Sequence, residues 1–276
     1  MLNIKPLRLR RMTLQMRELT IGESIAIASS PPHLEEALCT TFLNSTKAGV
    51  QSTIEGMDNP QNWTVQERIM AVCHYLSVTS DTGPDFQLEG GAHLTDYLDA
   101  SKDAALQDES ISLGELHQDK WHIRHLTGAM AESIERLVGQ IDGIDGRLHW
   151  ILGGMACQLV REGESMPDPV QKQNDFDAFI LEKIKIISAY PESEFEQLMF
   201  MYMEGRNDLH HLFITNFSNE GIVALPVPKE GEGVAESMSP ARFPVRQCIS
   251  RIAHDLARKP IEHSVQSEPV RKYTND

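Results

Sequence analysis

Three histidines, His117, His122 and His125, lie close enough in the sequence to suggest a metal site. Imidazole is a common ligand of zinc and other transition metals. On a helix, where successive residues turn by about 100°, the three rings would spread over an arc of about 140°. That arc is too wide for one tight site without ligands from elsewhere. We therefore interpret the three as solvated helix residues, and we expect no metal or other cofactor.

Cys73 and His74 are the second candidate, as a nucleophile and its base. Neighbours on a helix point about 100° apart, so the imidazole would not reach the thiol. The chain has four cysteines, whose spacing matches neither a zinc-ligand pair nor a compact disulfide framework. They are Cys39, Cys73, Cys157 and Cys248. This spacing predicts ordinary buried thiols.

The motifs that identify common enzymes do not occur in this sequence. It has no Gly-rich phosphate-binding pattern, and neither the G-x-S-x-G nor the H-E-x-x-H pattern. Gly153-Gly154 falls in an apolar stretch, which is typical of close helix packing rather than phosphate contact. We therefore predict that the chain is not an enzyme. A metal-dependent hydrolase that uses the three histidines or Cys73 is the alternative.

The composition limits the classes of partner. The net charge of −15 over 276 residues argues against a protein that coats nucleic acid. No apolar run approaches the roughly 20 residues that cross a bilayer. The N-terminal residues alternate apolar and charged positions, unlike a signal peptide. We expect a soluble chain with no direct nucleic-acid contact and no membrane insertion.

The charge is unevenly distributed along the chain. Residues 1–17 carry five basic and no acidic residues, and residues 242–276 carry seven basic and four acidic ones. Residues 18–241 hold 13 basic and 36 acidic residues. Basic ends around an acidic middle favour contacts between chains, with neutralisation inside one chain as the alternative. The predicted partner-binding residues are Arg8, Arg10, Arg11, Arg246, Ile249, Arg251, Ile252 and Leu256.

Two stretches near the N-terminus predict extended or irregular structure. Residues 7–16 alternate apolar and polar positions with one slip at Arg10-Arg11, which predicts a strand with a bulge. Residues 45–62 are rich in Ser, Thr, Gly and Asn and predict a loop.

Helix start signals follow these stretches. Thr20 and Glu23, and again Thr64 and Glu67, have the spacing of a capping box, in which hydroxyl and carboxylate satisfy each other's backbone donors. We expect a helix after each box and another after Pro31-Pro32. In the middle of the chain, residues 113–138 and 148–160 predict two long helices joined by a Gly-Asp turn, as a helical hairpin.

The C-terminal part mixes helices with a β-hairpin. Apolar spacing predicts helices over residues 176–187 and 191–205. Two β-rich runs joined by four turn residues predict a hairpin over 211–226. It needs a third strand or a helix, and the N-terminal strand is the nearest candidate. Residues 245–257 predict a basic amphipathic helix.

These elements predict a mainly α fold. It has a multi-helix body and a small antiparallel β element, made of the N-terminal strand and the hairpin near 211–226. The expected segments are a basic extended arm or strand at 1–19, an acidic helical body with a C-terminal β-hairpin at 20–226, a linker at 227–244, and a basic amphipathic helix with a polar tail at 245–276.

The order of parts resembles the tail and baseplate proteins of tailed bacteriophages over residues 10–226. The pieces that carry the resemblance are not chemical motifs. They are Leu19-Thr20-Ile21-Gly22-Glu23, Leu126-Thr127-Gly128, Glu132-Ser133-Ile134-Glu135, Gly154-Met155-Ala156 and Pro191-Glu192-Ser193-Glu194-Phe195.

The resemblance implies a non-enzymatic structural subunit of a phage tail or baseplate, made in the host cytoplasm and retained in the virion. Its basic termini would join neighbouring subunits. Its partners would be other virion or assembly proteins, in a homo- or hetero-oligomer. A tail-assembly chaperone that is absent from the mature particle is the alternative.

Overall fold

The N-terminal residues form a three-stranded antiparallel sheet in the computed structural model, which describes residues 2–79, 83–88, 91–106, 110–116, 119–228 and 238–257. Strand β1 (Leu7–Arg8) and strand β2 (Thr13–Met16) are joined by a tight turn, in which the Leu9 N–H donates to the Met12 carbonyl at 2.8 Å. The slip in the sequence pattern is therefore a turn between two strands and not a bulge in one strand.

The third strand of this sheet lies where a loop was expected. Strand β3 (Lys47–Gln51) pairs with β2, and Val50 lies opposite Leu14. The prediction of a loop over 45–62 was wrong for these residues. Their composition is poor in strand-forming residues, but β2 supplies backbone partners and a buried face, and this pairing outweighs local preference.

Both predicted capping boxes form and begin helices. The Glu23 N–H donates to Thr20 Oγ1 at 3.3 Å, and the Glu67 N–H donates to Thr64 Oγ1 at 3.1 Å. In each box the carboxylate accepts from the Thr backbone N–H, at 2.8 Å. The helices that follow are α1 (Ile21–Ala28) and α3 (Val65–Thr79), with α2 (Glu35–Thr46) between them.

The expected helix over 113–138 is wrong for most of its length. Strands β4 (Ser110–Leu116) and β5 (Asp119–Arg124) occupy its first part, and helix α4 covers only Gly128–Arg136. In β5, Trp121 and Ile123 are buried and alternate with more exposed neighbours, which is a strand period. The apolar residues between 116 and 130 are so widely spaced that they fit a helical period as well as a strand period.

The helices predicted downstream are confirmed, with small shifts at their ends. They are α5 (Gly146–Gln158), α6 (Gln173–Ser188) and α7 (Glu192–Asp208). Strand β6 (Leu159–Arg161) follows α5 directly and pairs with β5, completing the second three-stranded sheet. The turn predicted at 142–146 separates α4 from α5.

The predicted hairpin is confirmed as β7 (Ile214–Ser218) and β8 (Gly221–Leu225). Its outer neighbour is not the N-terminal strand, which pairs with β3 instead. Ala224 pairs with Ala241, with backbone hydrogen bonds of 2.8 and 2.9 Å.

The C-terminal stretch is not one helix. A 3-10 turn, η4 (Val245–Cys248), is followed by helix α8 (Arg251–Ala257). The break has a local cause, because the Ser250 hydroxyl accepts from the Ala253 N–H at 3.3 Å and so begins a new helix. The remaining short elements are η1 (Pro60–Asn62), η2 (Leu94–Asp96) and η3 (Ala100–Ala105).

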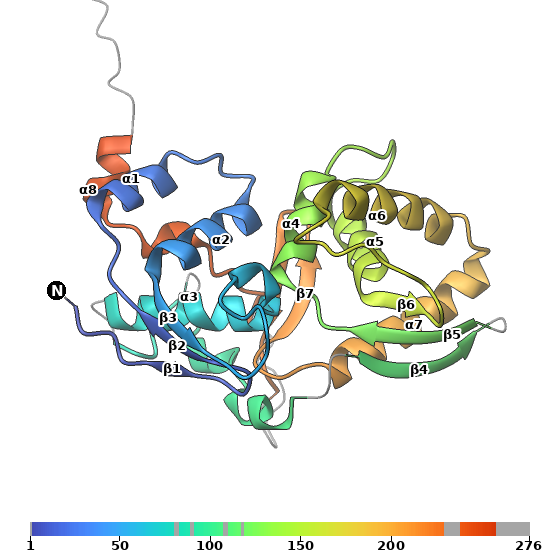
Figure 1. Cartoon of the computed structure of the whole chain (residues 1–276), viewed down its shortest axis with the longest axis horizontal. Coiled ribbons are helices and arrows are strands. Elements are labelled where there is room, and N and C mark those ends of the chain that lie inside the picture. Colours follow the sequence, from blue (N-terminus) through green and yellow to red (C-terminus); the bar gives the residue numbers. More distant parts are fainter. Residues whose placement is uncertain are drawn as a thin grey trace, which may run out of the picture.

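The described chain packs around two hydrophobic cores. We call the described parts of 2–106 and 238–257 the first lobe, and those of 110–225 the second lobe. The two lie side by side, with α4 and β7 where they meet (Figure 1). Both ends of the described chain contribute to the first core, for example Leu14 and Val245.

The fold is therefore mixed α/β rather than plainly mainly α. Eight α-helices and eight strands occur in the ranges described, and the strands form two three-stranded sheets and one hairpin. Within these ranges no helix is both long and apolar enough to cross a membrane.

Helix packing in the second lobe depends on Gly154, and this gives a testable prediction. A Cβ at this position would lie 2.6 Å from Tyr202 Oη and 2.7 Å from Phe217 Cζ. We expect Gly154→Ala to lower the free energy of unfolding by about 2 kcal/mol, because overpacking a buried contact forces neighbours out of place. Urea unfolding measures the change.

Gly22→Ala is the matched control, since a Cβ on Gly22 would meet nothing within 4 Å. Its helical position should make this control neutral or stabilising by about 0.5 kcal/mol. Equal effects of the two substitutions would show that Gly154 has no packing role.

Candidate functional site

Helix α4 joins the two lobes through its acidic side chains. The Glu135 carboxylate accepts from the backbone N–H groups of Glu36 and Ala37, at 2.8 and 3.1 Å. These groups begin α2, whose own N-cap residue, Leu34, has no side-chain acceptor. A carboxylate from the second lobe therefore caps a helix of the first lobe, where it also meets the positive end of the helix dipole.

Arg68 of α3 lies at the centre of this contact and is only 1% exposed. Its guanidinium donates to the Glu36 carbonyl at 2.5 Å and lies 3.5 Å from the Glu132 carboxylate and 3.6 Å from that of Glu36. A Cβ on Gly128 would lie 1.7 Å from Arg68 Nη1. The first residue of α4 must therefore be glycine for the arginine to fit.

Glu132 connects three elements of the first lobe to α4. Its carboxylate accepts from the Thr40 hydroxyl of α2 and, at 2.7 Å, from the Gln61 side-chain amide of η1. It also faces Arg68 of α3. We call Arg68, Glu36, Glu132 and Glu135 the inter-lobe cluster.

Arg136, one turn after Glu132 and 4.0 Å from its carboxylate, ties the same helix to its own lobe. Arg136 makes a two-pronged pair with Asp177 of α6, at 3.0 and 2.9 Å, and the Ser133 hydroxyl donates to the same carboxylate. Paired contacts of this kind fix orientation as well as distance. As a result charged side chains of α4 contact both lobes.

Burial of this many carboxylates has an electrostatic consequence. Burial raises the pKa of Glu135 to about 7, and it also raises the pKa of Glu36 and of nearby Glu35. Arg68 lowers the pKa of Glu36, but by less than burial raises it. The inter-lobe cluster therefore has more carboxylates than Arg68 alone neutralises, and Arg136 lies 4.0 Å from one of them, that of Glu132.

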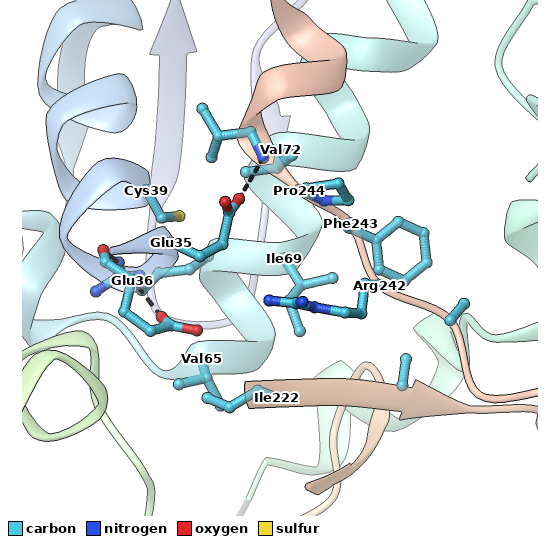
Figure 2. Close-up of a pocket in the computed structure, with 14 residues that line it drawn as sticks. Glu35, Glu36, Cys39, Val65, Ile69, Val72, Ile222, Arg242, Phe243 and Pro244 are labelled. Atoms are coloured by element: carbon cyan, nitrogen blue, oxygen red, sulfur yellow. Dashed lines mark hydrogen bonds and ion pairs between the residues drawn. The ribbon is translucent and has the colours of Figure 1, made fainter. Parts of the chain in front are cut away.

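A small cavity of about 40 Å³ lies beside the inter-lobe cluster. Glu35, Glu36 and Cys39 of α2 line one side, and Arg242 and Phe243 line the other (Figure 2). This volume holds only a few water molecules. A wider depression of about 500 Å³ adjoins it and shares Glu35 and Arg242.

Two of the acidic or thiol groups around the small cavity are occupied or unreactive, whereas Nε and Nη1 of Arg68, which also lines it, make no hydrogen bond to a described residue. The Glu35 carboxylate accepts from the Val245 N–H at 2.6 Å. Burial raises the pKa of the Cys39 thiol to about 12, so at neutral pH it is protonated and a poor nucleophile. The contacts of the inter-lobe cluster join the two lobes.

The histidines considered for a metal site are placed differently from the helical expectation. His117 lies outside the described residues. His122 lies on strand β5, and His125 follows that strand, buried against His211 with ring centroids 5.3 Å apart. Across the described ranges, no three His, Cys, Asp or Glu side chains are grouped so that they could hold a metal ion.

The predicted basic residues of the N-terminal arm have different surroundings. Arg8 and Arg10 lie at the β1–β2 hairpin and are exposed. Arg11 turns inward, where its guanidinium lies 3.5 Å from the buried Glu67 carboxylate and donates to the Asn62 carbonyl at 3.4 Å.

The predicted C-terminal residues divide in the same way. Arg246 donates to the carbonyls of Ala28, at 3.0 Å, and of Ser30, which end α1, and Ile249 is 7% exposed. Arg251, Ile252 and Leu256 of α8 are exposed.

Sequence reasoning did not single out the inter-lobe cluster. A signal was available in α3, where Glu67-Arg68 stand between Val65 and Ile69 in a helix that is otherwise mainly apolar. Charged residues on a buried helix face need partners, because burying an unpaired charge is costly. The acidic partners of Arg68 lie 32 or more positions away in the sequence, so spacing could not identify them.

No protein-family model, curated protein or solved structure matches this chain.

The raised pKa of Glu135 predicts a pH effect on stability. The folded state, with a pKa of about 7, holds the proton more tightly than the unfolded state, whose ordinary value is 4.5. Protonated Glu135 thus makes its full contribution to the free energy of unfolding below pH 4.5, and this contribution is lost as the pH rises through 7. Between pH 5 and pH 8, the free energy of unfolding of Glu135→Gln should therefore rise by up to about 3 kcal/mol relative to that of the wild type.

Urea unfolding of both proteins at the two pH values measures this difference. Glu182→Gln, at a side chain that is 68% exposed, is the control and should show no such gain. A Glu135→Gln difference that stays constant with pH would mean that the carboxyl does not titrate in this range.

Proposed function

We propose that the chain is a non-enzymatic structural subunit of a bacteriophage tail or baseplate, which contacts neighbouring virion proteins through surfaces at its two basic ends. The observation that carries this proposal is the outward face of α8. Ile252 and Leu256 are 66% and 60% exposed, whereas Ala253 of the same helix is completely buried.

The two exposed residues of α8 form one face. They are four positions apart, so they lie one above the other on the helix. The inner face already packs in the first core through Ala253. Apolar side chains on a second, outward face favour an additional protein contact.

A groove beside the start of α8 extends this surface. It has a volume of about 460 Å³, and its lining mixes polar side chains such as Glu18 and Gln247 with apolar ones, among them Leu19, Ile21 and Ile249. Ile21 is 53% exposed. The groove and the outward face of α8 together offer a partner exposed apolar side chains with polar groups beside them.

The charges at the two ends support the same proposal. Arg8, Arg10 and Arg251 are exposed, on a chain whose residues 18–241 are strongly acidic. Exposed charges of this kind direct the orientation of an encounter more than they add affinity. The inter-lobe cluster, by contrast, uses its charged groups within the chain, which favours a structural role over a catalytic one.

The test is a double substitution on α8, Ile252→Ser with Leu256→Ser, in the phage that encodes the chain. Deleting either end would be a poor test, because Leu14 and Val245 belong to the first core. We expect the variant to fold, and its amount in purified tails to fall by about tenfold, the equivalent of 1.4 kcal/mol of contact energy. Quantitative mass spectrometry of purified tails measures this amount.

Val138→Ser with Leu148→Ser is the matched control, because these apolar residues are 52% and 46% exposed elsewhere on the surface. This control should be incorporated normally. Normal incorporation of the α8 variant would contradict the role of that face. Absence of the wild-type chain from mature tails would contradict a structural subunit and favour an assembly chaperone.

A further inference from the structure

Helix α7 presents an acidic face with an aromatic residue at its centre. Phe200 is 62% exposed and Met203 is 39% exposed. Glu196 and Glu204 lie four positions before and after Phe200, so all these side chains share one face. Both carboxylates are exposed, and neither makes an ion pair with another described residue.

The remaining charges of α7 strengthen this face. The helix contains five acidic residues and one basic residue, Arg206. Arg206 turns inward, where it donates to the Thr215 carbonyl at 2.6 Å and lies 4.6 Å from the centre of the Phe217 ring. The exposed face of α7 is therefore acidic, because the one basic residue of the helix points into the protein.

The β1–β2 hairpin has the opposite character. Residues 1–17 contain no acid, and two of their arginines are occupied, Arg11 with Glu67 and Arg17 with Glu23. Arg8 and Arg10 are exposed, and neither guanidinium is within ion-pair distance of a carboxylate of the described residues, although the Asp103 carboxylate accepts from the Arg10 backbone N–H at 2.6 Å.

We propose that the α7 face binds the β1–β2 hairpin of a second copy of this chain. An arginine of the hairpin would lie on the Phe200 ring, between the carboxylates of Glu196 and Glu204. An arginine on an aromatic face gains from the negative ring face and from the weak hydration of the guanidinium.

The chain already uses this arrangement internally. The Arg161 guanidinium lies 5.9 Å from the centre of the Trp121 ring and pairs with Asp119 and Glu164, at 3.7 and 3.8 Å. An aromatic ring flanked by two carboxylates therefore accommodates an arginine in this structure. The α7 face has the same three components with no arginine present.

The dimensions of the two surfaces agree. A helical rise of 1.5 Å per residue places Glu196 and Glu204 about 12 Å apart along α7. Arg8 ends β1 and Arg10 lies in the turn that follows, so their Cα atoms are at most about 7 Å apart, and their long side chains span the difference.

The two surfaces belong to different lobes, with α7 in the second and the hairpin in the first (Figure 1). A contact between unlike surfaces either forms twice in a two-fold dimer or continues head-to-tail into a ring or an open chain. This inference does not depend on a phage origin, and it is tested on the purified chain alone.

The experiment is sedimentation equilibrium of the full chain at low salt over a range of concentrations. We expect the average mass to rise above the 31.0 kDa of one chain as concentration increases. Phe200→Ser should weaken association at least about fivefold, the equivalent of 1 kcal/mol for a lost cation–π contact. Salt at about 0.5 M should weaken it as well, because it screens exposed charges.

Charge reversal identifies the two surfaces. Arg8→Glu with Arg10→Glu should give a monomer, and so should Glu196→Arg with Glu204→Arg. A mixture of these two variants should associate again, because each reversed hairpin then meets a reversed helix. Lys120→Glu with Lys172→Glu matches the first charge change at exposed residues elsewhere and should associate like the wild type.

Two results would overturn the proposal. One is a wild-type chain that stays monomeric at every concentration and salt level. The other is association that the hairpin and α7 variants leave unchanged, or that the mixture of reversed variants fails to restore. Circular dichroism of each variant shows whether a loss of association reflects a loss of fold.

Discussion

The relation between the two lobes depends on one buried arginine and the carboxylates around it. Arg68 can occupy its position only because Gly128 has no side chain and because Glu36 and Glu132 face its guanidinium. Removing one partner from a buried charge pair usually costs more than the pair contributes, since the other charge remains buried and unpaired. The two lobes are therefore joined by a contact in which neither the arginine nor its carboxylate partners can be changed without a large loss of stability.

Different parts of the fold were predictable for different physical reasons. Capping boxes at Thr20 and Thr64 depend on residues three positions apart, so the sequence predicted both helix starts. The hairpin over β7 and β8 was predictable because its turn and its strands are contiguous. Strand β3 was missed, because its partner β2 lies more than 30 positions away and only that pairing makes Lys47–Gln51 a strand.

The predicted partner-binding residues depend even more on tertiary contacts that the sequence does not reveal. Arg8, Arg251, Ile252 and Leu256 are on the surface, as a partner-binding role requires. Arg11, Arg246 and Ile249 belong instead to contacts within the chain, and nothing in their spacing distinguishes them from the exposed set. Net charge describes a segment, whereas the orientation of each side chain is decided by tertiary packing.

The first core contains residues from both ends of the described chain, and this affects the order of folding. The second lobe, within 110–225, has a core drawn almost entirely from a continuous stretch and is in effect an insertion into the first. A ribosome would release every residue of the inserted unit before Val245 and Ala253, which complete the first core. Contacts distant in sequence form slowly, so during synthesis the first core stays incomplete until η4 and α8 pack against α1, α2 and α3.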